Sequence, residues 1–140
     1  MSGGADLPAG MPTLRVAPMP ADANFHGEFY LTQIVSHHHT EQVSRFLHAG
    51  ERRGLTLPGI FGVFFYRSAR LSTLETLRSF LPVPIEGLTR EFGAGATAEE
   101  VCARTIRTLL DLGVQHFYVS NLPPGRAQRV LTEILESLHL

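Results

Sequence analysis

The stretch EFYLTQIVSHHHTEQVSRFLHAG, residues 28–50, contains a complete strand-to-helix unit. Residues 28–35 are rich in aromatic and β-branched side chains, and they are apolar on both faces around a central Thr-Gln pair. That pattern is typical of a parallel strand covered on both sides. Apolar residues recur at helical spacing in residues 40–49. The stretch therefore predicts one βα unit, with three histidines at residues 37–39 marking the junction.

Two more strand-to-helix units follow the first. Strands are expected at residues 57–65 and 114–120, and the last helix is expected at residues 126–138. Strands that alternate with helices imply right-handed crossovers and hence a parallel sheet. The sequence therefore predicts an α/β fold with about three βα units of parallel sheet and flanking helices.

The connection between the second and third strands has helical patterns of its own. Ser68 can cap a helix whose leucines continue to Leu81, and a shorter piece is expected at residues 85–92. Thr97 and Glu100 have the spacing of a capping box. In that motif the hydroxyl and the carboxylate each satisfy a backbone N–H of the first helical turn. A third helix is therefore predicted to begin there.

Residues 1–24 are rich in glycine, alanine and proline, which predicts a flexible lead-in with one short strand at residues 13–17. Residues 25–140 are expected to form the folded domain. A chain of 140 residues is long enough for one core. Apolar residues make up 44% of it and charged residues 18%, as in ordinary globular domains.

Composition excludes several classes of function. A formal net charge of -1 gives no reason to expect a nucleic-acid or anionic-membrane surface. The chain has no lysine, which excludes a Schiff-base mechanism and a P-loop lysine. Its single cysteine, Cys102, cannot form an internal disulfide and fits a reducing compartment. We find no signal-peptide pattern or membrane-spanning run, so the expected location is cytoplasmic.

The histidine triplet is the most visible candidate for a metal site. In an extended chain, His37 and His39 would lie on one face and His38 on the other, so at most two would converge. A zinc site normally needs three convergent protein ligands. The four other histidines have no matching spacing. We therefore expect a solvated or hydrogen-bonded turn at the triplet, and no metal site.

Catalytic groups in parallel sheets lie at the carboxyl ends of the strands. In this sequence those ends fall at residues 33–37, 64–67 and 119–122. A functional site, if the chain has one, is therefore expected where these three segments meet.

Motifs on the three expected strands resemble those of the methylenetetrahydrofolate reductases. They occur in the same order and spacing from residue 29 to residue 138: Thr32-Gln33, Leu57-Pro58-Gly59-Ile60, and His116-Phe117-Tyr118 followed by Asn121. Members of that family are (βα)8 barrels that hold FAD and pass a hydride from NAD(P)H through the flavin to methylenetetrahydrofolate. The resemblance implies a partial (βα)8 TIM barrel and a role in one-carbon metabolism.

The resemblance also implies five substrate-binding residues. Gln33 would hydrogen-bond the pterin, because a carboxamide offers one donor side and one acceptor side to the pterin edge. Tyr66 and its neighbour Phe65 would stack on a flat ring. Asn121 and His37 would line the same pocket.

Four of these residues also have a purely structural interpretation. Gln33 would then be a buried glutamine that bonds the backbone, and Phe65 and Tyr66 would be core aromatics. Asn121 would be the N-cap of the last helix.

The resemblance covers only the second half of the family's barrel. Segments matching the catalytic glutamate and most of the flavin contacts are absent from the sequence, which is shorter than the roughly 250 residues of a full barrel. The expected function is therefore the folate-binding half of a flavin-dependent reductase, truncated and without activity of its own. A complementary half-barrel chain or a second copy is the expected partner. The alternative is a non-catalytic half-barrel that binds a small heterocycle or a partner protein.

Overall fold

The structure, a computed structural model, describes residues 29–138. It contains three parallel strands in the order β1-β2-β3: β1 (Tyr30–Val35), β2 (Gly59–Phe64) and β3 (His116–Ser120). The strands alternate with six helical segments: η1 (His37–His39), α1 (Thr40–Arg52), α2 (Leu71–Arg78), α3 (Ile85–Gly93), α4 (Ala98–Asp111) and α5 (Ala127–Ser137). The predicted α/β fold with a three-stranded parallel sheet is confirmed. The lead-in and the strand expected at residues 13–17 lie outside the described residues.

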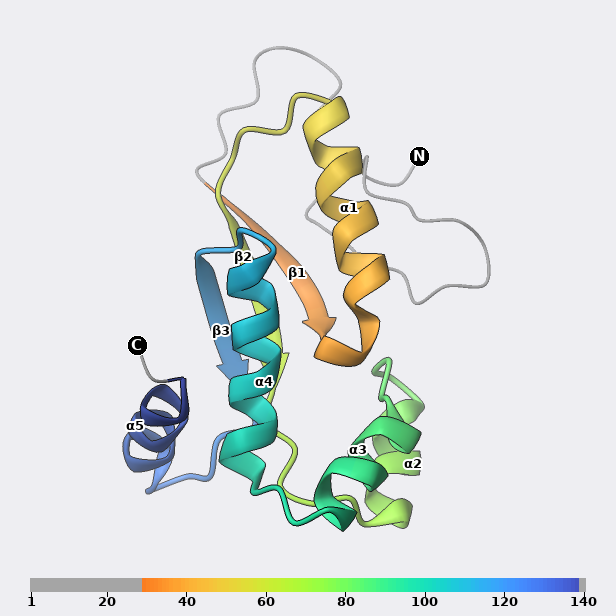
Figure 1. The fold of residues 1–140 in the computed structure, drawn as a ribbon, viewed down its shortest axis with the longest axis vertical. Helices are drawn as coiled ribbons and strands as arrows, with labels where there is room; N and C mark the ends of the chain where they lie inside the picture. The colour runs from red at the N-terminus through yellow and green to blue at the C-terminus, as the bar shows by residue number, and fades with distance from the viewer. Residues whose placement is uncertain (1–28, 139–140) are drawn as a thin grey trace.

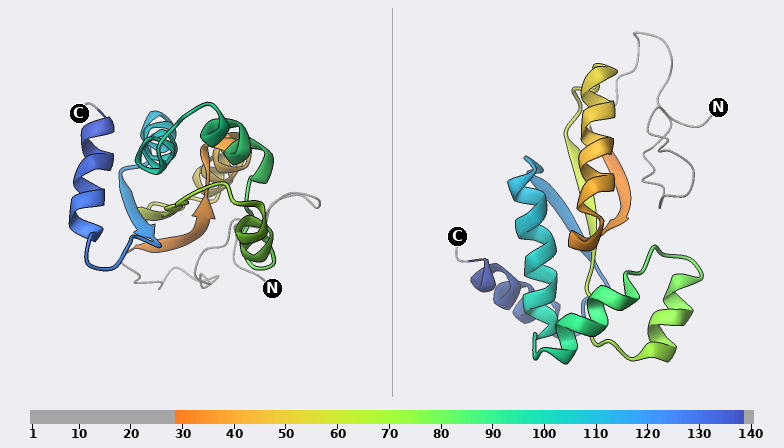
Figure 2. Two further views of the ribbon diagram at one scale, coloured as in Figure 1. Left: turned by 90° about the horizontal axis from the view of Figure 1, so that it is seen from below. Right: turned by 45° about the vertical axis from the view of Figure 1, so that its right-hand side comes forward.

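Helices α1, α4 and α5 lie along one face of the sheet, with α5 packed beside α4 (Figures 1 and 2). Side chains from this face of β2 and from the three helices form the main apolar core, in which the largest fully buried members are Phe46, Phe61, Leu109 and Ile134. Aromatic contacts join strand to helix, since the ring of Phe46 lies 6.0 Å from that of Phe61. Burial of these side chains is the main force that holds the helices to the sheet.

The opposite face of the sheet is not covered by a helix within residues 29–138 (Figure 2). Leu31 of β1 is 47% exposed there, and Ile60 is half-buried beside it. Two-sided cover was expected from the apolar composition of the strand at residues 28–35. Within residues 29–138 the cover is one-sided, because all the helices that pack on the sheet lie on one side of it, as expected for a sheet that forms only part of a barrel.

Strand β1 contains an irregularity in its pairing with β2. The register shifts between Leu31 and Ile34, so Thr32 and Gln33 together oppose one residue of β2. Three hydrogen bonds stabilise this bulge. The Gly62 N–H donates to Thr32 Oγ1 at 3.1 Å, Thr32 Oγ1 donates to the Gln33 carbonyl at 2.7 Å, and the Tyr118 hydroxyl donates to the Thr32 carbonyl at 2.7 Å. Such bulges bend a strand and redirect a side chain.

Gly62 makes room for the hydrogen bond that Tyr118 of β3 donates to the bulge in β1. A Cβ at this position would lie 2.5 Å from the hydroxyl oxygen of Tyr118, so the phenol occupies the space that any larger residue would need. The glycine therefore allows the Tyr118 ring to cross β2 and reach the backbone of β1.

A second apolar cluster joins α2 and α3 to the carboxyl ends of the strands (Figure 1). Its buried members are Tyr66, Leu74, Val83, Leu88 and Val101. Ser68 does not cap α2 as predicted, because the helix begins two residues later than expected and has Arg70 at its N-cap. The Ser68 hydroxyl instead accepts from the Arg70 N–H at 3.3 Å.

The capping box at the start of α4 is confirmed. The Glu100 N–H donates to Thr97 Oγ1 at 3.1 Å, and the Thr97 N–H donates to the Glu100 carboxylate at 2.8 Å.

Among the described residues, no helix has the length and apolar character needed to cross a bilayer.

Candidate functional site

Gln33 lies in the bulge of β1 and is exposed. It is therefore not the buried glutamine of the structural interpretation. Its backbone carbonyl accepts from the Thr32 hydroxyl at 2.7 Å. The resemblance assigns Gln33 to the edge of the pterin. In the structure this residue is accessible to solvent.

Phe65 and Tyr66 are both buried, with exposed fractions of 3% and 7%. Phe65 belongs to the main core, whereas Tyr66 belongs to the cluster under α2 and α3, where its ring lies 4.9 Å from that of Phe64. Burial raises the pKa of Tyr66 far above its ordinary value. The two neighbouring rings therefore pack in different clusters, as core aromatics do.

Asn121 follows β3 directly and contacts the residues that follow β2. Its backbone is in the left-handed region, with φ of 71°, and its side-chain amide donates to the Phe65 carbonyl at 3.0 Å. The Arg67 guanidinium donates to the Asn121 carbonyl at 3.2 Å. The expected N-cap role is wrong, because the N-cap of α5 is Arg126 and the helix begins at Ala127.

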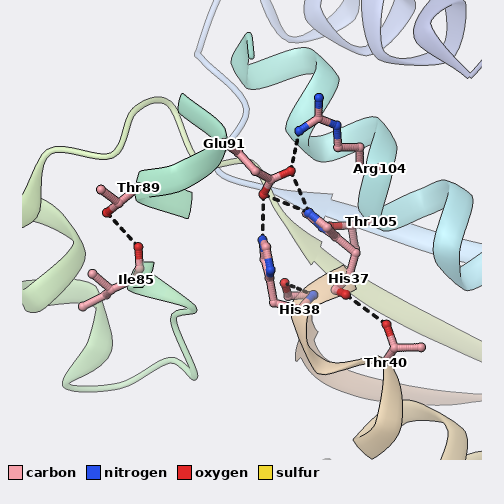
Figure 3. A network of polar contacts seen from close by, with 9 residues as sticks. His37, His38, Thr40, Ile85, Thr89, Glu91, Arg104 and Thr105 are labelled. Atoms are coloured by element: carbon pink, nitrogen blue, oxygen red, sulfur yellow. Dashed lines mark hydrogen bonds and ion pairs between the residues drawn. The ribbon is translucent and has the colours of Figure 1, made fainter. Parts of the chain in front are cut away.

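His37 belongs to a cluster of polar side chains from three segments (Figure 3). Glu91 of α3 is at its centre. The Nε2 atom of His37 lies 2.9 Å from both carboxylate oxygens of Glu91, and the Nε2 atom of His38 lies 2.6 Å from Oε1. Arg104 of α4 donates to Oε2 at 2.6 Å. Thr105, also of α4, completes the set, which we call the Glu91 cluster: His37, His38, Glu91, Arg104 and Thr105.

The two histidine rings are held in place from several sides. Thr105 Oγ1 lies 2.7 Å from Nδ1 of His37. The His38 backbone N–H donates to the Ser36 hydroxyl at 3.0 Å, which caps the short η1 helix. A Cβ on Gly87 of α3 would lie 2.3 Å from the His38 ring, so that ring packs directly on the helix backbone. The cluster is thus positioned by η1, α3 and α4 together.

Burial and charge act in opposite directions within the cluster. Burial lowers the pKa of His37 below its ordinary value, and the nearby Glu91 carboxylate only partly offsets this. Burial would raise the pKa of Glu91, but the hydrogen bonds from Arg104, His38 and His37 outweigh it and lower that pKa. The carboxylate is therefore held in its charged form among three nitrogen donors.

The sequence did not indicate this arrangement. An extended chain would place His37 and His39 on one face, but the η1 turn brings His37 and His38 together instead. The third member, Glu91, is 54 positions from His37 along the chain and lies on another helix. No short-range spacing links the two, so sequence patterns cannot reveal the contact. The hydrogen-bonded turn expected at the triplet is present.

An open groove with a volume of about 1030 Å³ runs between α4 and α5. Its walls carry charged side chains of both signs, among them Arg104, Arg107, Glu133 and Glu136. His37 lines one part of it, so the Glu91 cluster is reached from this groove. The other four predicted site residues are not part of its lining.

Comparison with known proteins adds no relative. No protein-family model matches the sequence, and no curated protein matches it either.

Proposed function

We propose that the chain supplies the folate-binding side of a flavin-dependent reductase barrel of the methylenetetrahydrofolate reductase type. The observation that carries the proposal is the bulge at Thr32-Gln33, which presents Gln33 to solvent from a strand otherwise paired in register. The motifs that resemble the family lie on or beside all three strands, and those strands are adjacent and parallel.

The topology supports a segment of barrel wall. In a (βα)8 barrel, consecutive parallel strands are neighbours and every helix packs on the outer side. The strand order β1-β2-β3 and the helices α1, α4 and α5 on one face follow that plan. The uncovered face of the described sheet would then face the barrel interior, and further polypeptide would supply the other strands.

The described residues do not fit the flavin itself. On the uncovered face, the space above Gly62 is filled by the phenol of Tyr118, and the neighbouring Leu31 and Ile60 are apolar. At Gly62, the ring of Tyr118 therefore occupies the space in which a bound group could approach the backbone. We therefore assign FAD and NAD(P)H binding to the other strands of the proposed barrel, and no redox step to this chain.

The pterin is the part of the substrate that this surface suits. A carboxamide at Gln33 can donate to one ring atom and accept from the next, and the ring of Tyr118 lies across the neighbouring strand. The bulge hydrogen bonds use the hydroxyls of Thr32 and Tyr118 within the sheet, so neither competes with Gln33 for a ligand.

Binding of methyltetrahydrofolate, measured by titration calorimetry, tests this proposal. We expect saturable binding by the wild-type chain and about tenfold weaker binding by Gln33→Ala, because one or two hydrogen bonds are lost. Gln115→Ala is the matched control, since Gln115 is an exposed glutamine just before β3, at the opposite end of the sheet. Absence of saturable binding, or equal losses in the two variants, would contradict the proposal.

A partner polypeptide on the same face is the second candidate. Leu31 and Phe29 are 47% and 49% exposed, and β1 is an edge strand of the described sheet. Edge strands with exposed apolar side chains tend to pair with further strands. Sedimentation velocity separates the candidates. If this face binds a second copy of the chain, the wild-type protein should sediment as an associated species and Leu31→Glu should convert it to monomers. If the face does not bind a second copy, the substitution should leave the sedimentation coefficient unchanged.

A further inference from the structure

The Glu91 cluster brings together two imidazoles and a carboxylate, a combination that binds metal ions in many proteins. The ligand-capable atoms of His37, His38 and Glu91 all lie within 4.8 Å of one another. The side chains of these residues are 13%, 22% and 12% exposed, so the atoms are sheltered but reachable.

We propose that His37, His38 and Glu91 bind one divalent transition-metal ion of the zinc class. Two nitrogen ligands and one oxygen ligand favour Zn²⁺ or Co²⁺ over Mg²⁺ and Ca²⁺, which prefer oxygen alone. Three protein ligands leave one position of a tetrahedral ion to solvent or to a bound group.

The distances require only a small opening of the cluster. A tetrahedral zinc ion with bonds of about 2.0–2.1 Å separates its ligand atoms by roughly 3.3 Å. The Nε2 atoms of His37 and His38 now lie 2.9 and 2.6 Å from Oε1 of Glu91. Side-chain rotations that lengthen these contacts by about half an ångström would admit the ion in place of the shared protons.

The surroundings have the features that orient metal ligands. Thr105 lies 2.7 Å from Nδ1 of His37, so a proton on Nδ1 can be directed at the hydroxyl while Nε2 keeps its lone pair. Arg104 donates to Oε2 of Glu91 and leaves Oε1 toward the two histidines. Contact with Gly87 fixes the position of the His38 ring.

The proposed site is accessible to solvent and lies at the carboxyl end of the sheet, where functional groups of parallel sheets are found. η1 follows β1 directly, so the cluster lies at the carboxyl end of that strand. His37 also lines the groove between α4 and α5, which provides a route for the ion. The inference is independent of folate binding, because it concerns side chains of η1 and α3 and needs no pterin.

Titration of the metal-free full chain, without a polyhistidine tag, tests the inference. We expect one equivalent of Zn²⁺ by calorimetry and, with Co²⁺, the visible absorption of a tetrahedral site. His38→Gln and Glu91→Gln should each weaken Zn²⁺ binding by more than about tenfold. His39→Gln is the matched control, because His39 is the adjacent member of the triplet and is not one of the three proposed ligands.

Two outcomes would overturn the inference. One is wild-type protein that shows no saturable Zn²⁺ binding in the micromolar range. The other is a loss in His39→Gln equal to that in His38→Gln, which would indicate a histidine-rich turn that binds metal without Glu91. If Glu91→Gln fails to fold by circular dichroism, the comparison of His38→Gln with His39→Gln decides the question alone.

Discussion

Helix α4 takes part in two polar networks that are built differently. The capping box joins Thr97 and Glu100, which are three residues apart and exposed. In the Glu91 cluster, Glu91 contacts Arg104 of α4, which is 13 positions away along the chain, and His37, which is 54 positions away. Its carboxylate is largely enclosed. The first network stabilises only the N-terminus of α4. The second fixes three segments relative to one another and has the side chains of a ligand site.

Removing the carboxylate of Glu91 should have the largest effect on stability. Glu91→Leu leaves two partly buried histidines and Arg104 without their acceptor, which should cost about 2–3 kcal/mol in the free energy of unfolding. Urea denaturation measures this change. Glu86→Leu on the same helix is the control, since Glu86 is exposed and should change stability by less than about 0.5 kcal/mol. Equal effects would show that the cluster does not hold the three segments together.

A substitution at Gly87 should disturb the same cluster without removing any of its members. The added methyl of Gly87→Ala would meet the His38 ring at 2.3 Å and force it away from Glu91. Crowding should lower the free energy of unfolding by roughly 1–3 kcal/mol. The higher helix propensity of alanine should raise it by up to about 1 kcal/mol. We expect a net loss of about 1–2 kcal/mol in urea denaturation. The control is Gly93→Ala, where a Cβ would meet nothing within 4 Å, and a loss as large there would contradict the account.

The capping box should contribute less than the Glu91 cluster. Thr97→Ala removes the acceptor for the Glu100 N–H, which should cost about 1 kcal/mol. Thr89→Ala provides the comparison within a helix, because the Thr89 hydroxyl only bonds the Ile85 carbonyl one turn back (Figure 3). Urea denaturation should show little change for Thr89→Ala. A Thr97→Ala loss larger than that of Glu91→Leu would reverse the ranking of the two networks.

The smallest effect should be a pH dependence at Glu100. Hydrogen bonds from the Thr97 backbone and side chain hold the pKa of Glu100 below its ordinary value of 4.5. Because the folded state has the lower pKa, the stabilisation is present above about pH 4.5 and is lost as the pH falls through the folded value. The difference in melting temperature between wild type and Glu100→Gln should therefore shrink between roughly pH 5 and pH 3. A difference that stays constant would contradict this.

The elements of the fold were predictable because their signals are local. Strands at residues 57–65 and 114–120 contain β2 and β3, and the capping box marked the start of α4 to the residue. The prediction for Ser68 was wrong because α2 begins two residues later, and a single serine does not specify which backbone N–H groups its hydroxyl meets.

The site was predictable only in part, for a physical reason. A strand pattern places Gln33 on β1, but the bulge that exposes it depends on Gly62 and Tyr118 from two other strands. The left-handed backbone of Asn121 likewise depends on its contact with Phe65 across the sheet. Contacts between distant segments contribute to both features, and the tolerance of asparagine for a left-handed backbone is the one local signal that the sequence carries for them.

Chemical-shift mapping of the ¹⁵N-labelled chain with methyltetrahydrofolate tests the central claim most directly, which is that the uncovered face of β1-β2-β3 binds the pterin. The account predicts that the largest shift changes fall on Leu31, Gln33, Gly62 and Tyr118. Changes confined to the helices that cover the other face, or no changes at saturating ligand, would contradict it.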